Sequence, residues 1–297
     1  MLTGTSPKVS IIMPAYNRAA LILDTIESIR NQSYSNWELI IVDDGSSDNS
    51  GELITALSDE RIRFHPVGRC GIVGRLKNIG LQKASGELIA FMDSDDLWEK
   101  TKLEKQVKAL DQYPEAGFSL TGGYNFRVPG QPVEYFNKKR EGITYGDMFI
   151  AFFKSEVPAF IQTLMARKEC IAAAGHFGES KSFSDVEFIL NLARSCKAVV
   201  LYEPLLFRRL HDSNDSQIHW EQRYHEGAGM IRSYKESLPG KIYNSALFKL
   251  YIRFGEEWLG YRDRKKAVIN FLKAWQYKPL SIVPFKKTVK ALLPLKK

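Results

Sequence analysis

The chain has few cysteines and no long apolar run, and these two deficits exclude several classes of protein. Its 297 residues include only Cys70, Cys170 and Cys196, which stand alone and lack metal-binding spacing. We therefore expect free thiols in a reducing compartment rather than a disulfide framework. No run reaches the roughly 18–20 apolar residues that cross a bilayer, and the N-terminus lacks the build of a signal peptide. The sequence predicts a cytoplasmic protein, at most peripheral on the inner face of the membrane.

Acidic residues are scarce at the C-terminal end. Residues 241–297 hold 14 Lys and Arg against three acids, a net +11, whereas residues 1–240 carry a net −3. Because the positive excess is confined to that end, and no nucleic-acid motif is present, we do not expect a nucleic-acid partner. Residues 281–297 contain five Lys and no acid, interleaved with aliphatic residues and Phe285. This composition suits either contact with an anionic membrane surface or a basic helix packed on its own domain.

Apolar runs typical of buried strands alternate with helical patterns in the first hundred residues. The apolar runs 9–13 (stopped by Pro14), 38–42 and 88–92 predict strands, a further strand is expected near 61–65, and the helical patterns are 19–31, 50–57 and 75–83. This alternation predicts an α/β fold with a mostly parallel sheet flanked by helices.

Later segments continue this pattern and then change character. A helix is expected over 99–113, strands near 117–123 and 198–202, and a loop-rich stretch at 124–145. From about residue 218 only helical patterns remain. We therefore expect a sheet-containing domain over residues 1–217 and a helical, basic extension over residues 218–297.

Three carboxylates follow the apolar run 88–92 at once: Asp93, Asp95 and Asp96. They would lie at the carboxyl end of a strand, where open α/β sheets bind ligands, and hard cations such as Mg²⁺ and Mn²⁺ prefer such oxygens. Alternatively, Asp96 caps a helix that begins near Leu97, with Glu99 completing a capping box. That alternative leaves Asp93 and Asp95 unexplained, because their like charges repel without a cation or protons.

The ends of the first two predicted strands are also polar. Pro14-Ala-Tyr-Asn-Arg18 follows the first, and Asp43-Asp-Gly-Ser-Ser-Asp48 follows the second. Either segment alone suits an ordinary turn. In a parallel sheet, however, both would converge with the acidic cluster at one edge.

In combination, these motifs resemble the family 2 glycosyltransferases with the GT-A fold, of the type that assembles bacterial surface polysaccharides. The matching stretches, which span roughly residues 8–212, are Val9–Arg18, Gln32–Ser46, Lys77–Gly80, Ala84–Glu87, Phe91–Trp98, Gly175–Glu179, Asp185–Leu190 and Glu203–His211.

The resemblance implies a role for each matching residue. The donor's nucleotide would be bound by Pro14, Tyr16, Asn17, Asp44, Arg75, Lys77, Asp93 and Ser94, of which Pro14, Tyr16 and Asp44 form the nucleobase pocket. Arg75 or Lys77 would neutralise the diphosphate, with a solvated helix face as the alternative. Asp95 would bind Mn²⁺ or Mg²⁺, and His211 and Arg209 would reach the metal or the diphosphate.

The resemblance also implies an inverting displacement in which Asp185 takes the proton of the acceptor hydroxyl. The alternative for Asp185 is a charge favoured at a helix N-terminus, and Glu187 is a second candidate for the base. Two positions depart from the family pattern: Ser184 stands where Glu usually precedes the Asp, and Arg208 where Tyr is usual.

The function implied is a metal-dependent inverting glycosyltransferase. It would move a sugar from a nucleotide-sugar, a UDP-sugar, to a hydroxyl of a glycan or lipid-linked glycan in cell-surface polysaccharide biosynthesis. The alternatives are a polyprenyl-phosphate glycosyltransferase and a nucleotide-sugar-binding protein without catalysis. Peripheral membrane contact through the basic C-terminal segment is a further expectation.

Overall fold

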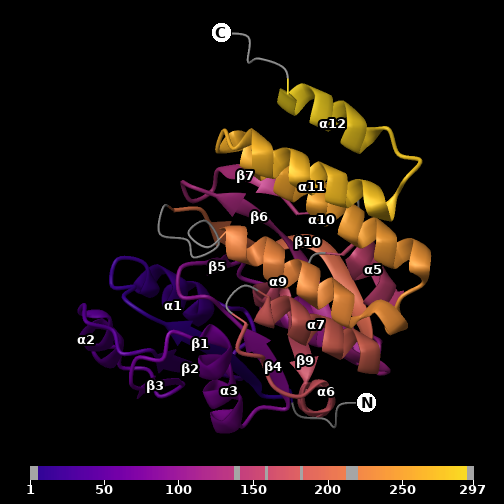
Figure 1. Cartoon of the computed structure of the whole chain (residues 1–297). Coiled ribbons are helices and arrows are strands. Elements are labelled where there is room, and N and C mark those ends of the chain that lie inside the picture. Colours follow the sequence, from indigo (N-terminus) through magenta and orange to yellow (C-terminus); the bar gives the residue numbers. More distant parts are fainter. Residues whose placement is uncertain (1–5, 137–140, 158–159, 181–182, 212–219, 293–297) are drawn as a thin grey trace. The chain divides into compact units, whose positions relative to one another are not determined.

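The computed structural model describes residues 6–136, 141–157, 160–180, 183–211 and 220–292 (Figure 1). The chain forms two compact units. The sheet unit comprises residues 1–152 and 156–212, and the helical unit comprises residues 153–155 and 213–297. The predicted boundary at 217/218 lies outside the described residues.

Ten strands of the described residues form one mixed, mostly parallel sheet in the order β3-β2-β1-β4-β9-β6-β10-β5, with β7 paired to β6 and β8 to β10. Strands β3, β2, β1 and β4 are parallel, as are β6 and β10, whereas β9 runs antiparallel to β4 and β6. The strands are β1 Val9–Ala15, β2 Trp37–Asp43, β3 Ile62–Pro66, β4 Leu88–Phe91, β5 Leu97–Trp98, β6 Ala116–Phe126, β7 Pro132–Tyr135, β8 Ile143–Gly146, β9 Met165–Arg167 and β10 Lys197–Arg209.

Helices cover this sheet, and the predicted α/β architecture is confirmed. They are α1 Ile22–Arg30, α2 Ser50–Thr55, α3 Val73–Lys83, α4 Lys102–Gln112, α6 Lys168–Ala174 and α7 Ser184–Ser195, with the 3₁₀ turn η1 Ile161–Thr163. A further helix, α5 Phe149–Lys154, contains residues of both units. Helix α3 packs on β1 and β2, and α4 packs on β6 and β10. A Cβ at Gly80 would lie 2.4 Å from Cγ2 of Ile12, so glycine permits the close approach of α3 to β1.

A buried carboxylate joins three segments at the amino end of the central strands. Glu38 accepts hydrogen bonds from the hydroxyl of Ser10 (2.6 Å), the backbone N–H of Ser85 (2.8 Å) and the ammonium of Lys8 (3.1 Å). Burial opposes ionisation of Glu38, but these hydrogen bonds outweigh it and lower its pKa to about 2. Glu38 therefore connects β1, β2 and the turn before β4.

Three local expectations are wrong. Strand β1 continues through Pro14 to Ala15, because β4 ends opposite Ile12 and no neighbour on that side needs the missing N–H. The loop-rich stretch at 124–145 contains β7 and β8. No helix begins near Leu97: Leu97–Trp98 form β5 against β10, and α4 begins at Lys102. The capping-box interpretation of Asp96 therefore fails.

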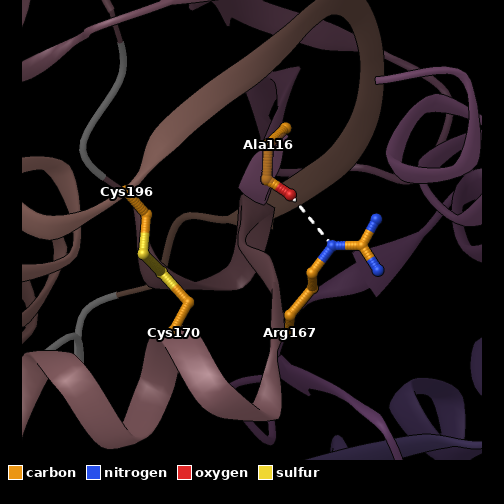
Figure 2. The surroundings of a disulfide bond; sticks show 4 residues. All are labelled: Ala116, Arg167, Cys170 and Cys196. Carbon is orange, nitrogen blue, oxygen red and sulfur yellow. Dashed lines mark hydrogen bonds between the residues drawn. A yellow bond between two sulfur atoms is a disulfide. The ribbon is translucent and has the colours of Figure 1, made fainter. Parts of the chain in front are cut away.

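The expectation of three free thiols is also wrong. Cys170 in α6 and Cys196 at the end of α7 form a disulfide beside the start of β6, where Arg167 donates to the carbonyl of Ala116 at 3.0 Å (Figure 2). A Cβ at Gly117 would lie 2.6 Å from Cβ of Cys196, so glycine leaves the space that the disulfide occupies. The two cysteines are 26 residues apart, and only the packing of α6 against α7 brings them together. The cysteines therefore do not support a reducing compartment.

The helical unit consists of helices that pack in sequence order. They are α9 Trp220–Ser233, the 3₁₀ turn η2 Lys235–Ser237, α10 Gly240–Gly260, α11 Arg264–Tyr277 and α12 Val283–Leu292. Helix α10 packs on α9 and α11, and α12 packs on α11 (orange to yellow in Figure 1). Phe271 is fully buried, and the absence of a side chain at Gly255 makes room for its ring. Within the described residues, no helix is both long and apolar enough to span a bilayer.

Candidate functional site

The segments that follow β1 and β2 are hydrogen-bonded to each other. The backbone N–H of Asn17 donates to Oγ of Ser46, and Oδ1 of Asn17 accepts from the N–H of Ser47, both at 2.8 Å. Asn17 adopts a positive φ of 48°, which asparagine tolerates better than most residues. In this structure Asn17 therefore holds the two loops in register.

The predicted nucleobase residues Tyr16 and Asp44 come together, and a third side chain joins them. Asp44 is 1% exposed and accepts from the backbone N–H groups of Cys70 (2.7 Å) and Gly71 (2.9 Å). Arg69 forms an ion pair with Asp44, and its guanidinium carbon lies 3.6 Å from the centroid of the Tyr16 ring. Pro14 is buried in β1, two residues before Tyr16.

The acidic cluster lies at the end of β4. Ligand oxygens of Asp93, Asp95 and Asp96 all lie within 4.8 Å of one another. Burial raises the pKa of Asp93 to about 6; Lys77 opposes this shift, while Asp95 and Asp185 add to it. Burial also raises the pKa of Asp96 well above its usual range, and repulsion from Asp95 and Asp93 raises it further. Three buried or half-buried carboxylates thus repel one another strongly.

Each carboxylate of the cluster has a different partner. Nε2 of Gln162 in η1 donates to Oδ2 of Asp93. The backbone N–H of Arg209 donates to Oδ1 of Asp96 at 2.8 Å, and Nε of Arg209 donates to the carbonyl of Asp95 at 3.0 Å. Ser94, between the first two acids, is buried. The end of β10 therefore holds the acidic turn in place.

Asp95 is paired with two basic groups. Its Oδ2 lies 3.1 Å from Nε2 of His211 and 3.4 Å from Nε of Arg18. The sequence prediction that His211 and Asp95 belong to one site is consistent with this arrangement.

The residues at this site fit a divalent cation. Carboxylate oxygens and an imidazole nitrogen are suitable ligands for Mn²⁺, and Mg²⁺ accepts the oxygens. A cation would also offset the burial and the mutual repulsion that together raise the pKa values of Asp93 and Asp96. Asp95 and His211, which already face each other, are the residues that would hold it.

Asp185 lies in the first turn of α7 and is paired with a buried lysine. Nζ of Lys77 lies 2.6 Å from Oδ1 of Asp185; the Lys77 side chain is 1% exposed and that of Asp185 is 32% exposed. Lys77 and Asp185 both act electrostatically on Asp93. The acidic cluster and the predicted base therefore belong to one charged group of side chains.

The loop before α7 is held against α3. Asn78 donates from Nδ2 to the carbonyl of Phe177 (3.0 Å) and accepts from its backbone N–H (2.9 Å). A Cβ at Gly74 would lie 2.3 Å from the carbonyl oxygen of Gly178, so only glycine allows this approach. Arg75, predicted to bind diphosphate, instead forms an ion pair with Glu179 at 2.6 Å on the surface.

Sequence reasoning missed three residues of this site: Arg18, Arg69 and Gln162. Arg18 stands within a motif that was recognised, so its position next to Tyr16 and Asn17 was an available signal. Arg69 lies on an irregular segment and Gln162 in the 3₁₀ turn η1, far along the chain from their partners Asp44 and Asp93. No local pattern marks either of them.

Comparison with known proteins identifies the family. The family model described as Glycosyl transferase family 2 matches residues 10–169, more than half of the chain. The chain belongs to this family. This glycosyltransferase is 31% identical to a protein of Haemophilus influenzae named "Uncharacterized glycosyltransferase" over 263 residues, which cover 86% of the chain and 90% of that protein.

Two further similarities are to a curated glycosyltransferase and to a solved structure. It is 37% identical over 148 residues to the putative teichuronic acid biosynthesis glycosyltransferase TuaG of Bacillus subtilis; the match covers 49% of the chain and 58% of TuaG. The structure of S. aureus TarS in complex with UDP-GlcNAc superposes with a TM-score of 0.68 at 16% identity, covering 96% of this chain and 89% of that one. At this identity the superposition shows the GT-A fold alone.

Proposed function

We propose that this glycosyltransferase transfers a sugar from a nucleotide-sugar to a hydroxyl of a glycan or lipid-linked glycan acceptor. The reaction proceeds with inversion at the anomeric carbon and depends on Mn²⁺ or Mg²⁺. The observation that carries the proposal is the common electrostatic group of Asp93, Lys77 and Asp185. It joins the acidic cluster that suits a donor diphosphate to the carboxylate that suits an acceptor hydroxyl.

The nucleoside of the donor is assigned to Pro14, Tyr16, Asn17 and Asp44. An aromatic ring provides a surface on which a base stacks, and a carboxylate accepts an imide N–H of uracil. TarS, which has the same fold, binds UDP-GlcNAc, and this supports a UDP-sugar as the donor.

The diphosphate and the metal are assigned to the acidic cluster. Asp95 and His211 would hold the metal, with Asp93 and Ser94 directed to the ribose and to metal-bound water. When bound, the metal would supply positive charge that stabilises the leaving nucleoside diphosphate. Arg18 and Arg209, which contact Asp95 in this structure, provide further positive charge beside the leaving group.

The chemical step assigned to Asp185 balances as a single displacement. The oxygen of the acceptor hydroxyl forms a bond to the anomeric carbon as the bond from that carbon to the diphosphate breaks. The hydroxyl proton moves to the carboxylate of Asp185, and the electron pair leaves on the diphosphate. Lys77 is assigned to holding Asp185 in position, because its buried ammonium lies on that carboxylate. Arg75 would also be available to bind the diphosphate once its ion pair with Glu179 breaks.

A direct test is hydrolysis of the donor without an acceptor. UDP-glucose and UDP-GlcNAc are incubated with the enzyme and Mn²⁺, and the anomer of the released sugar is followed by proton NMR before it mutarotates. The proposal predicts slow release of the β-anomer from these α-linked donors, abolished by EDTA and by Asp185→Asn. Release of the α-anomer would contradict inversion, and undiminished hydrolysis in EDTA would contradict metal dependence.

The division of labour along the chain is part of the proposal: residues 1–217 form the catalytic domain and residues 218–297 a basic extension that contacts an anionic membrane surface. Residues 264–292 hold eight Lys and Arg and no acid. Exposed large apolar side chains of α11, α12 and the segment between them are Ile269, Leu272, Leu280, Ile282, Val283, Phe285, Val289 and Leu292. Apolar residues among lysines suit the interface of an anionic bilayer, where a lipid-linked acceptor would be found.

Co-sedimentation with vesicles tests the membrane contact. We expect binding to vesicles that contain phosphatidylglycerol and none to vesicles of phosphatidylcholine alone. Changing Leu280 and Leu292, 102% and 66% exposed, to serine is expected to weaken binding several-fold. The matched control changes Val128 and Val133, 52% and 58% exposed in the sheet unit, to serine and leaves binding intact. Equal binding to both vesicle types, or by the Leu280/Leu292 variant and the wild type, would contradict the proposal.

A further inference from the structure

The two groups assigned to the nucleobase, the ring of Tyr16 and the carboxylate of Asp44, are both in contact with one side chain of the protein itself. The guanidinium of Arg69 lies over the ring and forms an ion pair with Oδ2 of Asp44. We propose that Arg69 is an internal occupant of the nucleobase site, which the base of the donor displaces, so that Arg69 sets the affinity for the donor. This inference rests on the proposed function, because it presupposes a nucleotide-sugar donor.

The guanidinium resembles a nucleobase in two respects. It is planar and stacks on aromatic faces, and its N–H groups donate to a carboxylate in the plane of the group. Its carbon lies 3.6 Å from the centroid of the Tyr16 ring, and carbon atoms in contact are about 3.5–4.0 Å apart. No second planar group fits between them. A base that stacks on this face of Tyr16 must therefore replace Arg69.

Asp44 stays in place when the Arg69 side chain leaves. The backbone N–H groups of Cys70 and Gly71 donate to Oδ1 and Oδ2 of Asp44 at 2.7 and 2.9 Å, and these contacts do not involve the Arg69 side chain. An ionised carboxylate accepts about four hydrogen bonds, so departure of Arg69 opens an acceptor position on Oδ2. Displacement of the Arg69 side chain thus exposes the face of the Tyr16 ring and a hydrogen-bond acceptor of Asp44 at the same time, and both are already positioned for a base.

Arg69 is placed to move at small cost. The Arg69 side chain is 51% exposed, although its partner Asp44 is buried, so the guanidinium stays partly solvated and its cation–π contact and ion pair each contribute modestly. A Cβ at Gly68, beside it, would meet nothing within 4 Å, whereas the backbone of Arg69 lies against Gly45, where a Cβ would be 3.0 Å from the Arg69 nitrogen. The side chain can therefore rotate away while its backbone stays.

The test uses nucleosides, which lack the phosphates that a free arginine would attract. Titration calorimetry with UDP, GDP, dTDP and CDP in Mn²⁺ first identifies the preferred base, and the matching nucleoside is then titrated into each variant. Arg69→Ala is expected to bind the nucleoside roughly 3- to 30-fold more tightly than the wild type, the range expected for removing one cation–π contact and one ion pair of a half-exposed arginine. Arg69→Lys retains the charge without the planar group, and its affinity is expected to lie in between.

Arg61→Ala is the matched control. The Arg61 guanidinium lies 3.8 Å over the Trp37 ring and pairs with Asp59 at 2.8 Å. Trp37 begins β2, whereas Asp44 follows its end, so the control removes the same kinds of contact at the opposite edge of the sheet. Nucleoside affinity should be unchanged in Arg61→Ala. Equal or weaker nucleoside binding by Arg69→Ala, while the wild type binds a nucleoside diphosphate, would overturn this inference alone. Absence of nucleoside diphosphate binding in the wild type would overturn the proposed function with it.

Discussion

Replacing Asp185 by asparagine should cost stability as well as turnover, because Lys77 then loses its counter-ion. Lys77 is fully buried, and its Nζ lies 2.6 Å from Oδ1 of Asp185. Removing one partner of a buried ion pair costs about 3–5 kcal/mol, since the remaining charge is left uncompensated. Because Asp93 also attracts Lys77 and partly replaces the lost counter-ion, we expect Asp185→Asn to lower the free energy of unfolding by about 3 kcal/mol. For a unit of about 200 residues this corresponds to a fall in Tm of roughly 6–12 °C.

A double-mutant cycle separates this stability effect from catalysis. Lys77→Met removes the charge while keeping an apolar stem near the Phe177 ring, which lies 5.5 Å from Nζ. Because replacing both members of a buried pair is often nearly neutral, Lys77→Met/Asp185→Asn should regain most of the lost stability and remain inactive. Urea unfolding of the four proteins measures the coupling energy, expected at about 2–3 kcal/mol. Asp111→Asn, an exposed acid in α4, is the charge-matched control.

Two results would refute this reasoning. In the first, Asp185→Asn unfolds at the same urea concentration as the wild type, which would show that Lys77 does not depend on this carboxylate. In the second, the costs of the single substitutions add in the double variant, which would show that the two side chains do not interact.

Three further predictions concern stability. The pKa of Glu38 is lowered to about 2 from 4.5. The stability that its ionised carboxylate contributes is therefore fully present above about pH 4.5 and is lost as the pH falls towards 2. Measured by urea unfolding, Glu38→Gln should lower the free energy of unfolding by about 2–3 kcal/mol at pH 7 and by almost nothing near pH 2. Gly80→Ala should lower the free energy of unfolding by about 1–3 kcal/mol, because the new Cβ would clash with Ile12. Gly229→Ala in α9, where a Cβ would meet open space, should raise it by about 0.5–1 kcal/mol. The opposite order of the two Tm values would contradict both predictions. A reductant should lower the Tm of the wild type, because a disulfide with a 26-residue separation is expected to contribute about 3.5 kcal/mol, and should leave the Tm of Cys170→Ser/Cys196→Ser unchanged.

Much of the fold follows from local patterns in the sequence. Strands β1, β2 and β4 of the parallel half are largely apolar runs because both of their faces are covered, and this pattern can be read directly from the sequence. The same logic places the polar ends of β1, β2 and β4 at one edge, which is why Tyr16, Asp44 and Asp95 were found together in one region of the chain's sheet.

Contacts made between distant segments were not predictable in this way. The pairing of Cys170 with Cys196, the insertion of β5 against β10 and the position of Arg69 over Tyr16 depend on how separate elements pack. Lys77 illustrates the difference: its motif was recognised, but only the folded structure shows that its ammonium pairs with Asp185. The kinds of residue at the site were therefore predictable, and their partners were not.

The most direct test of metal-dependent donor binding is thermal unfolding of the wild type and of Asp95→Asn with UDP, each with and without Mn²⁺. At a UDP concentration of 100 Kd, binding stabilises the native state by about 2.7 kcal/mol. The Tm of the wild type, and of the Asp111→Asn control, should therefore rise by several degrees when UDP and Mn²⁺ are both present and not with UDP alone. Asp95→Asn should lose this rise. An equal rise without Mn²⁺, or a rise in Asp95→Asn that matches the wild type, would contradict the assignment of Asp95 and the metal dependence.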